Sequence, residues 1–229
     1  AVLGIVDESM LFCPQLRLKT RISTKVGSNA FTIADEISNM KSTGSEMQLL
    51  YHCNFGNPCL DEGARLVLPA SETAPRSPYP SKNTAGWASY QGPTPGYVEQ
   101  CFWHAPLGDA RGNTVALLRN ARGNRGIAVR YNVKQLPCFT QWKNTGADSD
   151  GYVTGLEPAT NYPNPRVFER RRGRVIKLAP GQSYNVDLTV EACADGAAVQ
   201  KVEKEIAALQ GKVPHKLQKR PLRKYSPGV

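Results

Sequence analysis

The chain has 229 residues, of which 40% are hydrophobic and 21% are charged, and its formal net charge at pH 7 is +10. These values are typical of a soluble globular protein that buries a sizeable core without needing disulfides or metals for stability. The absence of any run of about 18 apolar residues argues against a membrane-spanning helix. The apolar stretch at the N-terminus reaches an acidic residue at Asp7, so it is too short for the hydrophobic region of a secretory signal.

Alternation of apolar and polar residues with a period of two dominates the chain and predicts β-strands. The clearest cases are residues 16–22, 127–133 and 184–190. Shorter predicted strands cover residues 30–34, 47–55, 65–69, 97–103, 114–118, 138–143, 151–157 and 174–178. Turn residues such as Gly, Asn and Pro separate these segments. The pattern predicts an all-β fold, either an antiparallel sandwich or a barrel.

Residues 70–96 differ from the rest of the chain, because five prolines fall there among Ser, Thr and Gly. We expect a long irregular excursion in this region. Loops of such length inside a compact domain are usually functional. Two interpretations fit the pattern equally well: a wall or lid over a cleft, and a plain surface insertion.

One helix is predicted near the C-terminus. Four apolar residues follow one another there at helical spacing, namely Val199, Val202, Ile206 and Leu209. Asp195 is placed to cap the first turn. After Gly211 the prolines exclude regular structure, so we expect an extended arm. This pattern predicts a β-sandwich domain at 1–195, followed by the helix and a basic tail at 196–229.

Positive charge gathers in two places. Residues 201–229 contain eight Lys or Arg and two Glu, and a second basic cluster lies within residues 166–177. Such clusters can attract nucleic acid or anionic lipid. However, Tyr225 is the one aromatic residue among the tail cations. Nucleic-acid-binding segments usually add aromatic side chains on which bases stack, and the tail lacks a set of them. We therefore expect a solvated tail and a solvated turn, and predict neither a membrane nor a nucleic acid as partner.

The six cysteines, at positions 13, 53, 59, 101, 138 and 193, form no CxxC pair. Cysteine disulfide frameworks belong mainly to short secreted chains. We therefore expect free, mostly buried thiols in a reducing compartment, and hence a cytoplasmic location. The three histidines and scattered cysteines lack zinc-ligand spacing, so no metal and no cofactor is predicted.

Residues 49–55 contain the first group suited to proton transfer. A strand here would place the apolar side chains on one face and His52 with Asn54 on the other. A polar pair opposite an apolar row suits the floor of a wet cleft, where a His can act as an acid or a base. An equally open interpretation is a His52 that is satisfied by a backbone carbonyl at the edge of a core.

Residues 151–157 contain the second such group. Alternation would place Val153, Gly155 and Glu157 on one face. A carboxylate beside a Gly leaves open space above the strand, as a bound ligand would need. Pro158 restricts Glu157 to an extended conformation. An ordinary exposed Glu at a strand end is the competing interpretation.

These segments resemble the aldose 1-epimerase, or galactose mutarotase-like, family, and most closely its branch labelled as a domain of unknown function. The resemblance runs from about residue 3 to about residue 192. It rests on the segments 35–39 (DEISN), 49–58 (LLYHCNFGNP), 99–100 (EQ), 141–143 (QWK) and 155–161 (GLEPATN). The His and Glu segments also come in the order found in the family.

The resemblance implies a large antiparallel β-sandwich that interconverts sugar anomers by acid–base chemistry without a metal. By position, Glu157 would be the general base that removes the proton from the anomeric hydroxyl. His52 would be the general acid that protonates the ring oxygen, so that the ring opens. Two positioned groups of this kind each contribute roughly 10²–10⁴-fold. For both to reach one pyranose ring, they should lie several ångströms apart across a cleft.

The resemblance also implies residues that bind the sugar. Glu99 or Gln100 falls where family members hold substrate hydroxyls, and His104 lies nearby. Trp142 offers a face for sugar stacking, although core packing is an alternative use. The predicted substrate-binding residues are therefore Asn54, Glu99, Gln100, His104, Trp142 and Asn161.

Family members usually have a further N-terminal portion before the point at which this chain begins. That portion supplies additional strands and, in well-studied relatives, an Arg and a second His at the sugar site. We therefore expect a chain truncated at its N-terminus and a sandwich with an open edge. The leading functional hypothesis is a mutarotase-type isomerase acting on a small sugar. The alternatives are a non-catalytic carbohydrate-binding protein of the same fold and an anionic-surface binder acting through residues 201–229.

Overall fold

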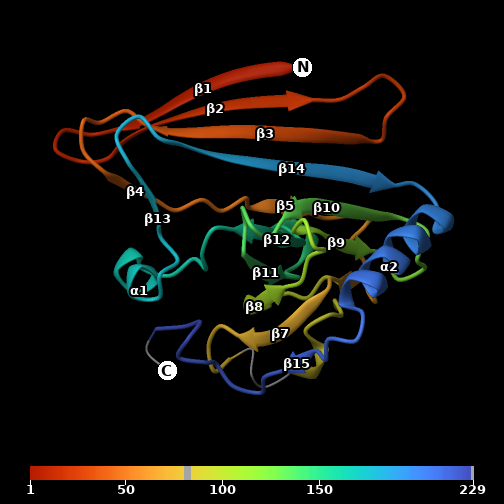
Figure 1. The fold of residues 1–229 in the computed structure, drawn as a ribbon. Helices are drawn as coiled ribbons and strands as arrows, with labels where there is room; N and C mark the ends of the chain where they lie inside the picture. Colours follow the sequence, from red (N-terminus) through yellow and green to blue (C-terminus); the bar gives the residue numbers. More distant parts are fainter. Residues whose placement is uncertain (80–83, 228–229) are drawn as a thin grey trace.

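Two sheets packed face to face form most of the molecule (Figure 1), and the computed structural model describes residues 1–79 and 84–227. The first sheet has seven antiparallel strands. Their order is β1 (Val2–Ser9), β2 (Gln15–Ser23), β3 (Ala30–Asn39), β14 (Ser183–Cys193), β10 (Gly126–Asn132), β9 (Asn113–Arg119) and β6 (Arg65–Val67). In Figure 1 β1 lies at the outer edge of this sheet, beside the N-terminus.

The second sheet has six strands. Their order is β15 (Lys216–Leu217), β7 (Ala70–Pro75), β8 (Gln100–Pro106), β11 (Cys138–Asn144), β12 (Val153–Ala159) and β5 (Cys53–Phe55). All pairings are antiparallel except that of β15 with β7. The remaining elements are the pair β4 (Ser45–Met47) and β13 (Ile176–Leu178), the 3-10 turn Asp148–Asp150, and the helices α1 (Arg166–Arg171) and α2 (Gly196–Gln210).

The main hydrophobic core lies between the two sheets. Leu118 and Val129 of the first sheet pack in one cluster with Phe139 and Leu156 of the second, and all four are fully buried. Burying a side chain of this kind contributes about 1.5–3 kcal/mol. This core fixes one face of each sheet toward the interior and leaves the other face of the second sheet available for a site.

The predicted strand pattern is confirmed for most of the chain, and the all-β sandwich is the observed architecture. Residues 47–55 are an exception, because the chain crosses there from one strand pairing to another: β4 pairs with β13, whereas β5 pairs with β12. His52 therefore lies just before β5 rather than within a strand. The strands β1, β7 and β15 and the helix α1 were not predicted from the sequence. β7 begins the segment 70–96 that was expected to be irregular, and β1, α1 and β15 lack the periodic patterns on which the predictions rest.

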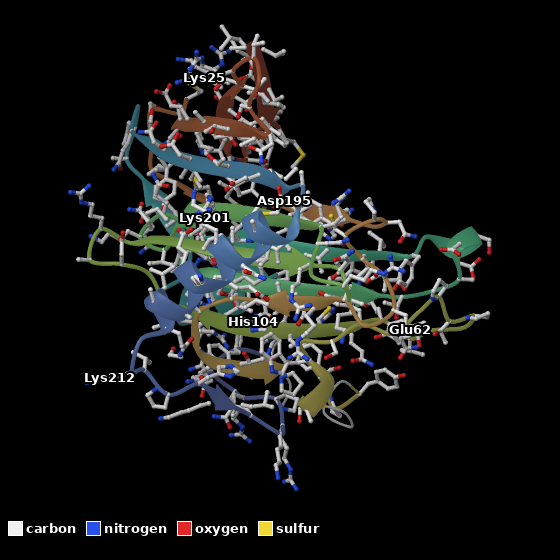
Figure 2. All side chains as sticks on the ribbon, turned by 90° about the vertical axis from the view of Figure 1, so that its right-hand side faces the viewer. Lys25, Glu62, His104, Asp195, Lys201 and Lys212 are labelled. Atoms are coloured by element: carbon white, nitrogen blue, oxygen red, sulfur yellow. The ribbon has the colours of Figure 1, made fainter. Side chains whose placement is uncertain are left out.

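The C-terminal helix is confirmed, together with its cap. Asp195 accepts a hydrogen bond of 2.8 Å from the backbone N–H of Ala198. Figure 2 shows Asp195 at one end of α2 and Lys212 beyond the other. The helix buries Val199, Val202 and Ile206 against the outer face of the seven-stranded sheet.

We expect Asp195→Ala to lower the free energy of unfolding by about 1 kcal/mol, because the substitution leaves a helix N-terminal N–H without its acceptor. Urea denaturation followed by circular dichroism measures the change. Asp195→Asn is the matched control, since it keeps an acceptor oxygen and should stay within a few tenths of a kcal/mol of the parent. Equal losses in both variants would contradict a capping role.

The end of the basic tail is docked on the sheet, which corrects part of the prediction, whereas residues 211–217, 219 and 220 are exposed as expected. Glu72 of β7 accepts a hydrogen bond of 2.6 Å from the Tyr225 hydroxyl and pairs with Lys224 at 2.5 Å. Tyr225 and Ser226 are buried, and Trp103 Nε1 donates a hydrogen bond of 2.8 Å to Ser226 Oγ. In Figure 1 the tail runs beneath β7.

The basic turn within 166–177 is likewise built into the fold. Glu169 of α1 is fully buried, and Arg174 pairs with it at 2.5 Å. Arg170 forms a second ion pair with Glu46 of β4 at 2.6 Å. These contacts give the cluster a structural use that charge counting along the sequence did not reveal.

All six cysteines are free thiols, and four of them are buried. Across residues 1–79 and 84–227, no helix is both long and apolar enough to cross a membrane.

Candidate active site

Glu157 lies on the outer face of the six-stranded sheet. Its neighbour Leu156 points into the core between the sheets, so alternation along β12 turns the carboxylate the other way. The Glu157 side chain is only 4% exposed. No hydrogen-bond donor within the described part of the chain reaches its Oε1 atom. A buried carboxylate oxygen without a donor is costly and suits a ligand hydroxyl.

Gly155 provides the space that the Glu157 carboxylate occupies. A Cβ at position 155 would lie 2.5 Å from Glu157 Oε1, 3.2 Å from His52 Cε1 and 3.3 Å from the Trp142 Cβ. Three of the predicted site residues thus converge over one glycine. The sequence predicted open space for a ligand at Gly155, but the side chains of Glu157, His52 and Trp142 fill that space.

His52 reaches the carboxylate from the segment before β5. Its Nε2 atom lies 3.2 Å from Glu157 Oε1, although this contact does not meet hydrogen-bond geometry. Its Nδ1 atom lies 2.8 Å from Asn54 Oδ1. The His52 side chain is 48% exposed, so solvent reaches the pair from that side. The pair is in direct contact, whereas the sequence analysis expected a gap of several ångströms.

Trp142 and Glu99 form the next part of the site. The Trp142 indole contacts the His52 ring edge-on, with centroids 5.5 Å apart. Trp142 Nε1 donates a hydrogen bond of 2.6 Å to Glu99 Oε2. The structure thus brings Asn54, Glu99 and Trp142 to the two proposed catalytic groups.

Burial raises the pKa of Glu157 to about 7, and the nearby Glu99 carboxylate acts in the same direction. His52 and Arg76 oppose this shift, because a positive charge favours the ionised carboxylate. A carboxyl with a pKa near neutrality is suited to general base catalysis at physiological pH.

Gln100 and His104 do not join the site, which corrects their predicted role. Along β8 they alternate with Cys101 and Trp103, and Cys101 pairs with Trp142. Gln100 and His104 therefore face the opposite side of the sheet from Glu157. His104 is fully buried and its Nδ1 bonds to the Thr73 hydroxyl at 2.8 Å; Figure 2 shows it among the strands.

Asn161 is buried and its amide is already engaged. Its Nδ2 donates a hydrogen bond of 2.5 Å to the Tyr162 carbonyl, and its Oδ1 accepts one of 3.1 Å from the Thr160 hydroxyl. The side chain therefore holds the turn after β12 through one donor and one acceptor of its amide.

The predicted excursion 70–96 begins with β7, and residues 80–83 lie outside the described part of the chain. Gln141 donates a hydrogen bond of 2.9 Å to the Trp87 carbonyl. Lys143 Nζ donates three more, to the carbonyl oxygens of Gly86 at 3.0 Å, Trp87 at 3.4 Å and Ser89 at 2.6 Å. Because Gln141 and Lys143 face away from Glu157, the segment 84–90 covers the opposite side of the sheet and is not a lid over this site.

The sequence analysis missed Arg76. It directly follows β7, and its backbone N–H donates to the Cys101 carbonyl at 2.9 Å. Its guanidinium lies 3.6 Å from Cys101 Sγ and 3.9 Å from Glu99 Oε1. A single Arg among Ser, Thr and Pro residues gave no sequence signal, because only the pairing of β7 with β8 brings it beside Glu99.

The C-terminal tail also lies on this face. Tyr225 belongs to a hydrophobic cluster with Cys101, Trp103 and Tyr162, and both Trp142 and Leu222 pack against that cluster. The tail and the Trp142 side chain thus pack against the same cluster. Within residues 1–79 and 84–227, no group of three or more His, Cys, Asp or Glu side chains is placed to hold a metal ion.

The family model described as "Domain of unknown function (DUF4432)" matches residues 1–192. The chain belongs to the DUF4432 family. A solved protein from Klebsiella pneumoniae, provisionally named an aldose 1-epimerase, is 38% identical to it with a TM-score of 0.93. The match covers 96% of the DUF4432 chain, which spans only 57% of the Klebsiella chain.

More distant structures share the fold of this DUF4432 chain. A provisionally named aldose 1-epimerase from Escherichia coli K12 is 14% identical to this chain, with a TM-score of 0.59. The match covers 82% of this chain and 63% of the Escherichia coli chain. A galactose mutarotase-like protein from Clostridium acetobutylicum is 16% identical to this chain, with a TM-score of 0.57. The match covers 82% of this chain and 61% of the Clostridium chain. The DUF4432 chain therefore has the galactose mutarotase-like fold. A match to rat cubilin, 32% identical over 74 residues, covers only 31% of this chain and 2% of cubilin.

Proposed function

We propose that this chain carries the acid–base pair of an aldose 1-epimerase-type isomerase, which interconverts the anomers of a small sugar. The observation that supports the proposal most is the convergence of His52 Nε2 and Glu157 Oε1 at 3.2 Å over Gly155. The carboxylate oxygen receives no donor from the described residues, and the anomeric hydroxyl of a sugar would supply one.

In the proposed mechanism Glu157 removes the proton from the anomeric hydroxyl while His52 delivers a proton from Nε2 to the ring oxygen. The electron pair of the former O–H bond becomes the carbonyl, and the bond between the anomeric carbon and the ring oxygen breaks. Rotation about the bond between the first two carbons exposes the other face of the aldehyde. On ring closure His52 Nε2 takes the proton from the hydroxyl that attacks the aldehyde, and Glu157 gives its proton to the former carbonyl oxygen, so the enzyme ends in its starting state.

The direct contact between the two groups requires one movement before a sugar can bind. His52 precedes β5 and is half exposed, so its ring can move away from Glu157 Oε1 while Nδ1 keeps its contact with Asn54. The buried Glu157 stays in place. The same contact supports a second candidate, a carbohydrate-binding protein in which His52 merely neutralises Glu157.

Anomer-resolved proton NMR on a panel of hexoses and pentoses tests the proposal. We expect the full-length protein to accelerate equilibration of at least one freshly dissolved anomer above the spontaneous rate. Sugar binding without acceleration for any sugar in the panel would favour the binding protein instead. His52→Gln serves as the matched control, because it removes the acid and leaves Glu157 in place.

The pH dependence of kcat/KM should show an acid limb that is set by the ionisation of Glu157. Burial raises the pKa of this carboxyl to about 7, and only the ionised form acts as a base. Below that pH we expect kcat/KM, after subtraction of the spontaneous rate, to fall about tenfold per pH unit. An acid limb centred near pH 4.5, the ordinary value for a Glu, would mean that another group is the base.

A further inference from the structure

Asn54 holds one nitrogen of the His52 ring. The two atoms in contact are His52 Nδ1 and Asn54 Oδ1, which lie 2.8 Å apart. An amide oxygen only accepts hydrogen bonds, so Nδ1 must carry the hydrogen in this arrangement. The contact therefore selects one of the two tautomers of the neutral imidazole.

The selected tautomer assigns a role to the other nitrogen. A neutral imidazole carries one ring hydrogen, so Nε2 of His52 is left with a lone pair when Nδ1 is protonated. Nε2 faces Glu157 Oε1 at 3.2 Å. Without a proton between them, the Nε2 lone pair and the carboxylate oxygen repel each other. One additional proton, on either Nε2 or Oε1, supplies a hydrogen-bond donor and makes the contact favourable. The mobile proton of the site thus belongs to Nε2 and Glu157, and Nδ1 keeps its own.

The backbone fixes Asn54 more firmly than it fixes His52. Asn54 lies in β5 and pairs with Gly155 of β12, the residue over which the carboxylate sits. His52 lies outside the strand and depends on side-chain contacts for its orientation. Trp142, which donates a hydrogen bond to Glu99, contacts the ring edge-on, and Asn54 supplies a directional contact to Nδ1.

We propose that Asn54 is a positioning residue that keeps the proton of His52 on Nδ1, so that Nε2 alone exchanges protons with the substrate and Glu157. When Nε2 gives its proton to the ring oxygen, the imidazole becomes neutral without losing its bond to Asn54. Nε2 takes the proton back on ring closure. This role replaces the sugar contact expected for Asn54 from the sequence, and its catalytic consequence rests on the proposed function.

The tautomer can be measured without any activity, by nitrogen NMR of protein labelled with ¹⁵N-histidine. The chain has three histidines, so the spectrum contains three ring systems, and His52→Gln identifies the relevant one. At a pH where the ring is neutral, we expect Nδ1 of His52 to resonate as the protonated nitrogen and Nε2 as the unprotonated one. His104 and His215 are internal references.

Two variants of Asn54 distinguish the effect of its acceptor oxygen from the effect of its side-chain size. Asn54→Leu has similar size and no acceptor, so the tautomer should shift toward Nε2–H. Asn54→Asp keeps an acceptor oxygen and should retain Nδ1–H. Unchanged nitrogen shifts in Asn54→Leu, or a parent ring already protonated on Nε2, would overturn the proposal whether or not the protein isomerises sugars.

Kinetics adds a second readout once a substrate is known. We expect Asn54→Leu to lower kcat about 10- to 100-fold, the effect of losing a hydrogen bond to a charged group, while KM changes little. Asn54→Asp should restore most of the rate. A rise in KM with kcat unchanged would instead show that Asn54 binds the sugar, and would contradict the positioning role.

Discussion

Replacing Glu157 with Gln should lower kcat for anomer interconversion by about 10²–10⁴-fold, the range expected for loss of a general base. The amide is nearly the same size as the carboxylate, so it fits over Gly155 without a new clash. It cannot accept the anomeric proton at neutral pH. Polarimetry with the sugar that the parent protein turns over most rapidly measures the change.

The same variant distinguishes an enzyme from a binding protein. We expect Glu157→Gln to bind the sugar with an affinity close to that of the parent, as isothermal titration calorimetry would show. A parent protein that binds the sugar without turning it over would favour the carbohydrate-binding alternative. A Glu157→Gln variant that keeps more than a tenth of the parental rate would show that the base lies elsewhere.

Gly155→Ala should cost about 10²-fold in kcat while the protein stays folded. The new methyl group would lie 2.5 Å from Glu157 Oε1, closer than such atoms approach. The end of the Glu157 side chain is flexible, so the carboxylate moves rather than the sheet. A misplacement of about 1 Å at a reacting group is enough for a loss of this size. Initial rates of anomer equilibration measure the effect.

Gly146→Ala is the matched control for this substitution. A Cβ at position 146 would lie 3.7 Å from the Asp150 Cβ, which is an ordinary contact. Both variants should unfold cooperatively, with Gly155→Ala the less stable by about 1–3 kcal/mol because of overpacking. Parental kcat in Gly155→Ala would show that the position of the carboxylate above this glycine does not matter for the reaction.

The sequence by itself determined the strand-rich architecture and the two segments that carry the candidate site. Alternation identified the strands that became β2, β10 and β14, because a strand with one buried face must alternate. Helical spacing together with Asp195 located α2. The resemblance of the His52 and Glu157 segments to one family also proved informative, since both side chains meet in the fold.

Only the tertiary structure decided which face of the sheet carries the site. Alternation tells which residues share a face but not which face is covered, so Gln100 and His104 were placed at the site although they face the other way. The contacts of Arg76 and of the docked tail join residues far apart in sequence. Those contacts depend on the pairing of β7 with β8 and β15, which no local pattern of residues encodes.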